Sequence, residues 1–274
     1  MDAHDTDSLF AGSIPEVYDT YLVPLIFESY AADLAPRLAQ RRPRRVLEIA
    51  AGTGVVTRAM DTMLSSDTLI VASDLNPAML ARAKVQGTQR AVEWCQADAQ
   101  QLPFDDGGFD AVVCQFGAMF FPDKHKAFAE ARRMLAPGGV FVFNVWDRIE
   151  LNEFAQAVTE ALARFLAGSP PQFLRRTPHG YHDPAAVLRD LASAGFDSSR
   201  ASWETTSARS RATSSRIPAH AYCQGTPLRG EIEARAPDQL ARATTAASKA
   251  IEKGFGAGVV DAGIQAHVFV VERD

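Results

Sequence analysis

The chain has 274 residues, of which 47% are hydrophobic and 22% charged, and its formal net charge is −5. This composition is typical of a globular protein with a large core, and it excludes wholesale disorder. A net negative charge argues against nucleic acid as a partner, because proteins that bind phosphate backbones usually carry a basic surface.

The cysteines indicate a reducing compartment. Cys95, Cys114 and Cys223 form no CxxC pair, and the first two fall inside apolar, strand-like runs, which is typical of core residues. No His/Cys/Asp cluster has the spacing of metal ligands, so no metal is expected. The segment MDAHDTDSLF is acidic and lacks the apolar run of a signal peptide, and no stretch approaches the roughly 18 apolar residues of a membrane span. We therefore expect a cytoplasmic protein without a membrane partner.

Residues 1–40 are predicted to form a helical cap. Val17, Tyr21 and Leu25 recur near helical spacing. Pro24 lies among them, and proline usually kinks or ends a helix, so two short helices are expected.

Strands and helices are predicted to alternate over residues 44–147. Near-continuous apolar runs predict five strands, at residues 46–50, 68–74, 92–98, 109–117 and 139–147. The helix before the fifth strand is expected to stop at Pro137-Gly138-Gly139. Such alternation predicts an α/β fold of the Rossmann-like, doubly wound kind, with a mostly parallel sheet and helices on both faces.

The remaining residues, 148–274, are predicted to complete the sheet and form the substrate side. We expect a helix over 151–165, an inserted loop over 168–183, a helix from Asp183-Pro184 and a strand near 199–207. A helical stretch with Leu240 and Ile251 and a last strand over 264–271 follow, which brings the sheet to seven strands. With no interdomain linker in view, 1–274 is predicted to be a single domain comprising the cap (1–40), a cofactor-binding core (44–147) and the substrate side (148–274).

The sequence VLEIAAGTG (46–54) predicts a ligand site. A strand that contains Glu48 runs into a turn with Gly52 and Gly54, and a helix follows. Glycines allow a ligand to approach the backbone, and a helix N-terminus offers free N–H groups. An ordinary tight turn is the alternative.

Polar residues also end the next three predicted strands. Asp74 follows Gly52 by 22 residues, where a carboxylate can accept hydrogen bonds from two ribose hydroxyls. Asp98-Ala99 and Gln115 end the third and fourth strands, and ligands of open α/β sheets bind outside these carboxyl ends. Asp74 as a helix cap and Asp98 as a solvated loop residue are the alternatives.

Together these motifs resemble a known family. ExAxGTG, ASDLNPAML, DAQQLPFDDGGFDAVV and RMLAPGG resemble the class I S-adenosylmethionine-dependent methyltransferases over residues 44–147. The likeness is strongest to the ubiquinone/menaquinone-biosynthesis methyltransferase-like group. It implies S-adenosyl-L-methionine as cofactor, S-adenosyl-L-homocysteine as product and in-line methyl transfer to an oxygen, nitrogen or carbon of a small molecule.

The resemblance also implies roles for individual residues, in four groups along the cofactor. These are Glu48, Ala50, Gly52 and Gly54 at the methionine end; Asp74 at the ribose; Leu75, Met79, Asp98 and Ala99 at the adenine; and Gln115 at the amino group through its backbone carbonyl. Ala50 departs from the pattern, because the family often has glycine there.

The catalytic residues are less defined by sequence. His179, His182 and Tyr21 are candidates for the substrate pocket, and histidine is the usual general base near neutral pH. A nicotinamide-dependent oxidoreductase or epimerase is an alternative, but it would favour a glycine where Val55 stands and a Tyr-x-x-x-Lys pair. A non-catalytic, cofactor-binding interaction protein is another. The acceptor atom, the need for a base, the pathway and the oligomeric state stay open at this level.

Overall fold

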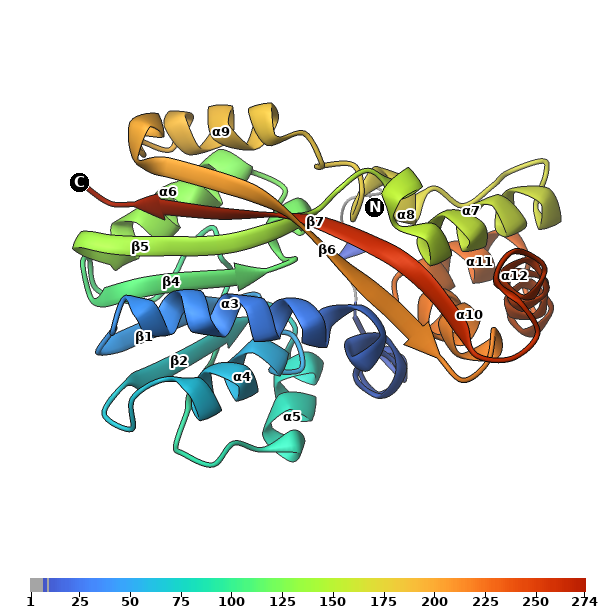
Figure 1. Cartoon of the computed structure of the whole chain (residues 1–274), viewed down its shortest axis with the longest axis horizontal. Helices are drawn as coiled ribbons and strands as arrows, with labels where there is room; N and C mark the ends of the chain where they lie inside the picture. The colour runs from blue at the N-terminus through green and yellow to red at the C-terminus, as the bar shows by residue number, and fades with distance from the viewer. Residues whose placement is uncertain (1–6, 9) are drawn as a thin grey trace. The chain divides into compact units, whose positions relative to one another are not determined.

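The structure is a computed structural model that describes residues 7–8 and 10–274 (Figure 1). The chain forms two compact units. Unit 1 comprises Met1–Phe27, Trp146–Gly180 and Ser207–Gln265, and unit 2 comprises Glu28–Val145, Tyr181–Thr206 and Ala266–Asp274. The organisation of 1–274 as a single domain stays a prediction.

Within the described residues, seven strands form one sheet. They are β1 (Arg45–Ile49), β2 (Leu69–Asp74), β3 (Glu93–Gln96), β4 (Phe109–Gln115), β5 (Leu135–Trp146), β6 (Ala201–Ala212) and β7 (Val260–Glu272). Their order is β3-β2-β1-β4-β5-β7-β6. The pairs β1–β2, β1–β4, β2–β3 and β4–β5 are parallel, whereas the arrow of β7 points opposite to that of β4 (Figure 1). The predicted Rossmann-like, mostly parallel seven-stranded sheet is confirmed.

Helices precede and separate these strands. The longer ones are α2 (Ile14–Val17), η1 (Tyr18–Phe27), α3 (Glu28–Gln40), α4 (Val55–Met63), α5 (Pro77–Gln86), α6 (Lys124–Met134), α7 (Glu153–Phe165), α8 (Phe173–Arg176), α9 (Pro184–Ser193), α10 (Arg216–Gln224), α11 (Leu228–Arg235) and α12 (Leu240–Phe255). Short 3₁₀ turns are η2 (Ala118–Phe120), η3 (Ile149–Leu151) and η4 (Ser198–Arg200).

Both faces of the sheet in unit 2 are covered by apolar side chains. On one face, Val140 and Val142 of β5 belong to a core that includes Leu34 of α3 and Met60 of α4. On the other face, Phe141 and Phe143, which alternate with these valines along β5, pack on Phe128 of α6. Successive residues of a strand point to opposite faces, so a continuous apolar run satisfies both layers.

The predicted break at Pro24 is wrong. Residues 14–40 are helical without interruption, and Pro24 lies inside the π-helical segment η1. Proline lacks an N–H and clashes with the carbonyl of an ordinary α-helical turn. The wider π turn accommodates both the missing N–H and the proline ring, so the helix continues past Pro24.

Two other expectations need correction. The Pro137-Gly138-Gly139 segment lies inside β5, which begins at Leu135. Phe109 of β4 pairs with Leu135, but Ala111 pairs with Val140. The residues of β5 between these two pairs have too few partners on β4, so they form a bulge. The predicted loop over 168–183 contains the one-turn helix α8. In addition, α10 and α11 lie in a region for which the sequence pattern predicts no separate helices.

Candidate functional site

The turn between β1 and α4 has an unusual backbone. Ala50, Gly52 and Gly54 all have positive φ angles, of 54°, 57° and 80°. A Cβ on Gly54 would also meet Cη2 of Trp94 at 3.0 Å. Glycine is unstrained in this left-handed region, whereas an alanine there costs about 1–2 kcal/mol. Ala50 therefore adopts, under strain, a backbone conformation that would be unstrained for glycine.

Asp74 ties this turn to the end of β2. The N–H of Gly52 donates to its Oδ2 at 2.8 Å, and the N–H of Asn76 donates to its Oδ1 at 2.8 Å. The residue is only 7% exposed, and burial raises the pKa of its carboxyl, while the two backbone hydrogen bonds act in the opposite direction. The carboxylate thus holds two loops in position at the carboxyl edge of the sheet.

Glu48 lies beside this carboxylate on β1. It is 2% exposed and accepts a hydrogen bond from the hydroxyl of Thr57 on α4. Burial raises its pKa to about 8; Thr57 and the charge of Arg58 lower it, and the charge of Asp74 raises it. Arg58 itself donates to the carbonyl oxygen of Thr53 at 2.7 Å. Thr57 and Arg58 thus adjoin the candidate site, and the sequence analysis missed both. The signal that could have identified them is their place in the first turn of the helix after the glycine turn.

The buried Glu48 carboxyl predicts a pH-dependent stability. Because its folded pKa, about 8, exceeds its ordinary value of 4.5, its contribution to stability is full below pH 4.5 and is lost as the pH rises through 8. We expect Glu48→Gln to remove this loss, so that the difference in free energy of unfolding between variant and wild type changes by up to about 1.4 kcal/mol per pH unit between these values. Urea unfolding of both proteins across this range measures the difference. Glu93→Gln, at an exposed position on β3, is the control, and parallel curves for Glu48→Gln and wild type would contradict the prediction.

The segment just after β3 is hydrogen-bonded to the backbone of Asp74. The N–H of Ala97 donates to the carbonyl oxygen of Asp74 at 3.1 Å, and Asp98 follows with an exposed side chain whose Oδ1 accepts the N–H of Gln100. Glu48, Asp74 and Asp98 thus lie at neighbouring strand ends of unit 2.

The apolar residues predicted for the adenine differ in exposure. Leu75 is 50% exposed and can receive a flat ring, whereas Met79 is only 3% exposed on α5. Ala99 is also buried, with 8% of its surface exposed. Leu75 is therefore the best placed of the three for direct contact.

The end of β4 is shaped by a residue that the sequence analysis missed. Asn144 on β5 pairs with Gln115, is fully buried, and accepts the N–H of Phe116 at 2.9 Å. Phe116 has φ 50°, and a Cβ on the next residue, Gly117, would lie 2.5 Å from Cβ of Ala50. The turns after β1 and β4 therefore touch. A lone amide within the apolar run FVFNVW is the signal that could have identified Asn144.

These residues fit an adenosyl cofactor with a positively charged end. Carboxylates at strand ends suit ribose hydroxyls and cationic groups. The hydroxyl oxygen of Thr53, in the middle of the turn, is buried and has no hydrogen-bond partner among the described residues. A buried polar atom without a partner costs free energy, so a ligand that supplied one would be favoured.

The candidate catalytic residues are divided between the units. His179 is buried in unit 1, and its Nδ1 lies 2.8 Å from the carbonyl oxygen of Asp147. A carbonyl oxygen only accepts, so Nδ1 carries the proton and Nε2 is the basic nitrogen. Tyr21, also in unit 1, packs edge-to-face on His220, whereas His182 belongs to unit 2.

Neither a membrane-spanning helix nor a metal cluster is found in the described part of the chain. No helix in residues 7–8 and 10–274 combines the length and apolar character needed to cross a membrane. Over the same residues, no group of three or more His, Cys, Asp or Glu side chains is arranged to hold a metal ion.

Known proteins are similar to this chain in both sequence and fold. The profile of the family described as "Methyltransferase domain" matches residues 47–143. Demethylmenaquinone methyltransferase of Thermus thermophilus is 33% identical over 177 residues, which cover 61% of this chain and 79% of that protein. Ubiquinone/menaquinone biosynthesis C-methyltransferase UbiE of Idiomarina loihiensis is 36% identical over 126 residues, 44% of this chain. The chain spans about half the length of this UbiE relative, 47%.

A solved structure, the YcgJ protein of Bacillus subtilis, shares the fold with a TM-score of 0.55 at 17% identity, over 90% of this chain and 99% of that one. The identity to the Thermus protein over most of that protein's length shows the family as well as the fold. This chain belongs to the class I S-adenosylmethionine-dependent methyltransferases and resembles the UbiE group.

Proposed function

We propose that this methyltransferase acts on a small-molecule acceptor and holds its cofactor at the carboxyl ends of β1, β2, β3 and β4. The main support for this site is the pair of hydrogen bonds that the carboxylate of Asp74 accepts from the backbone N–H groups of Gly52 and Asn76. They place one carboxylate at the junction of two strand ends, where it is oriented before any ligand binds.

The proposed roles follow the order of the strands. Glu48, Ala50, Gly52 and Gly54 hold the methionine end of the cofactor, with Thr53 supplying a hydroxyl. Asp74 accepts hydrogen bonds from the ribose, Leu75 and Met79 adjoin the adenine, Asp98 and Ala99 hydrogen-bond its edge, and the carbonyl of Gln115 accepts from the amino group. Glu48 would ionise when a cation lies beside it, because a nearby opposite charge favours the carboxylate.

The protein's part in catalysis is then alignment and exclusion of water. S-adenosyl-L-methionine, when bound, supplies a methyl group that is already activated by its sulfonium. The chain therefore has to orient the acceptor in line with that group and keep water away. A hydroxyl or amine acceptor also needs to lose a proton, and His179, His182 and Tyr21 are the candidates for the general base.

Several observations support a small-molecule acceptor. The relatives are named for demethylmenaquinone methylation and for ubiquinone and menaquinone biosynthesis, and these quinones are small molecules. The net charge of −5 does not favour nucleic acid as the acceptor.

We also propose that the enzyme is cytoplasmic. It has three free cysteines, two of them buried, which suits a reducing compartment.

Methyl transfer is tested directly by mass spectrometry. The purified chain is incubated with S-adenosyl-L-methionine and a panel of phenols, quinols and amines, and we expect one compound to gain the mass of a methyl group as S-adenosyl-L-homocysteine appears. Asp74→Ala is the negative control. Tight cofactor binding with no methylated product across the panel would instead favour the non-catalytic alternative.

A further inference from the structure

Unit 1 contains a cavity of about 530 Å³, and none of its lining residues is among those that we propose to hold the cofactor. Helix α10 packs against both η1 and α12, and the cavity is lined from these three helices. Its polar lining consists of Arg216 and His220 from α10, Tyr21 from η1, and hydroxyl groups from α12. No lining residue is an aspartate or glutamate, although the protein as a whole is acidic.

Arg216 gives this cavity an uncompensated positive charge. Its guanidinium makes no ion pair or hydrogen bond with any residue that the structure describes. It is also the first residue of α10, where the positive end of the helix dipole adds to its charge. An anion in the cavity would therefore be attracted by both the guanidinium and the helix dipole, and no carboxylate in the lining would repel it.

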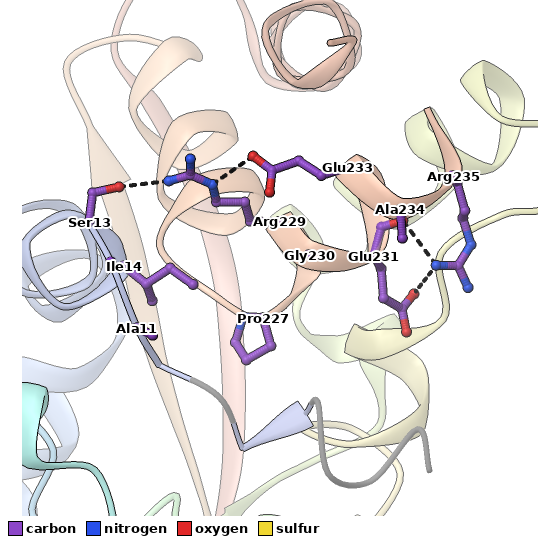
Figure 2. A pocket seen from close by; sticks show the side chains of 11 residues that line it. Ala11, Ser13, Ile14, Pro227, Arg229, Gly230, Glu231, Glu233, Ala234 and Arg235 are labelled. Atoms are coloured by element: carbon purple, nitrogen blue, oxygen red, sulfur yellow. Dashed lines mark hydrogen bonds and ion pairs between the residues drawn. The ribbon is translucent and has the colours of Figure 1, made fainter. Parts of the chain in front are cut away.

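A second cavity in unit 1 provides the contrast (Figure 2). It also measures about 530 Å³, but its arginines are already paired. Arg229 donates to the hydroxyl of Ser13 at 2.6 Å and to Glu233 at 2.9 Å, and Arg235 lies 3.5 Å from a carboxylate oxygen of Glu231 (Figure 2). An arginine in such a setting has little to offer a further anion.

The side chains around Arg216 are held in place. His220 lies four residues after Arg216 and so on the same face of α10, and its ring packs edge-to-face on Tyr21, with the ring centroids 5.0 Å apart. Burial lowers the pKa of His220, so the ring is neutral near pH 7 and can donate or accept a hydrogen bond. The hydroxyl of Ser248 on α12 lies 3.0 Å from that of Ser215, the residue before α10.

We propose that this cavity binds the carboxylate of a small organic molecule. The guanidinium of Arg216 presents two parallel N–H donors that match the two oxygens of a carboxylate. Tyr21 and Ile217 provide apolar surface for the body of the molecule. The volume lies within the usual range for small-molecule sites, and an inorganic anion alone would leave most of it unfilled. The proposal concerns binding and does not depend on methyl transfer.

Benzoate is the probe, and the measurement is a titration of the full chain followed by protein-observed NMR. We expect saturable binding that shifts the ring resonances of His220, assigned with a His220→Gln variant. Arg216→Gln is expected to weaken binding about tenfold or more, because it removes a bidentate, charge-assisted contact. Benzamide, which has the same shape without the charge, is expected to bind about tenfold more weakly than benzoate as well.

Arg229→Gln, in the paired cavity, is the matched control and should leave the affinity for benzoate unchanged. The side chain of Arg216 is exposed, so its variant is expected to fold, which circular dichroism checks. Equal affinity of wild type and Arg216→Gln, or no saturable binding of benzoate, overturns the proposal. Displacement of benzoate by inorganic phosphate at matching concentration also overturns it, because the site would then bind any oxyanion.

Discussion

Replacing Asp74 with alanine is expected to lower the affinity for S-adenosyl-L-methionine by about 10- to 150-fold. Charge-assisted hydrogen bonds of the kind proposed to the ribose are worth about 1.5–3 kcal/mol, which corresponds to that factor. The change also leaves the N–H groups of Gly52 and Asn76 without the carboxylate that holds them. The turn after β1 then loses its fixed position. The affinity for the cofactor therefore falls both because the ribose loses its hydrogen-bond acceptor and because this turn is no longer held.

Isothermal titration calorimetry measures the loss, and circular dichroism shows that the fold is kept. Asp74→Asn retains one acceptor oxygen and should give an intermediate affinity. Asp67→Ala removes the same charge from an exposed position before β2, so it should bind the cofactor as the wild type does. An unchanged affinity in Asp74→Ala would remove Asp74 from the site.

Gly117→Ala is expected to destabilise the protein by about 1–3 kcal/mol, the usual cost of overpacking a core. The new Cβ would lie 2.5 Å from Cβ of Ala50 and 2.8 Å from Sγ of Cys114, so both contacts have to be relieved by a shift of these residues. Ala50 already has a strained positive φ and belongs to the turn that we propose to hold the cofactor. The displacement should therefore lower cofactor affinity as well as the free energy of unfolding, and chemical denaturation with calorimetry measures both.

The partner residue supplies a rescue. In the double variant Ala50→Gly/Gly117→Ala the methyl group that causes the closest contact is gone, and glycine is unstrained at the φ of position 50. We expect part of the lost stability and affinity to return. Gly230→Ala, where an added Cβ meets nothing within 4 Å, is the control and should be neutral or slightly stabilising. A double variant as unstable as Gly117→Ala would show that the contact with Cys114, and not Ala50, dominates.

Local patterns in the chain are sufficient to predict the alternation of strands and helices and the Rossmann-like sheet. Strands buried on both faces must be apolar throughout, so the runs that end at Ile49, Asp74 and Gln115 are recognisable one at a time. Parallel pairing then places the carboxyl ends of these strands along one edge, so their polar end residues gather there whatever the packing details. The position of the candidate cofactor site follows from that.

The sequence by itself therefore determines the fold class and the sheet edge at which the candidate site lies. The tertiary structure alone shows that Thr57 reaches Glu48, that Asn144 holds the turn after β4, that Ala50 opposes Gly117, and that Pro24 lies within a continuous helix. The reason is physical: periodicity and turn chemistry act between neighbours in the chain, whereas these contacts join residues on different elements. The same holds for Arg216, because whether a charge is paired depends on what the fold brings beside it.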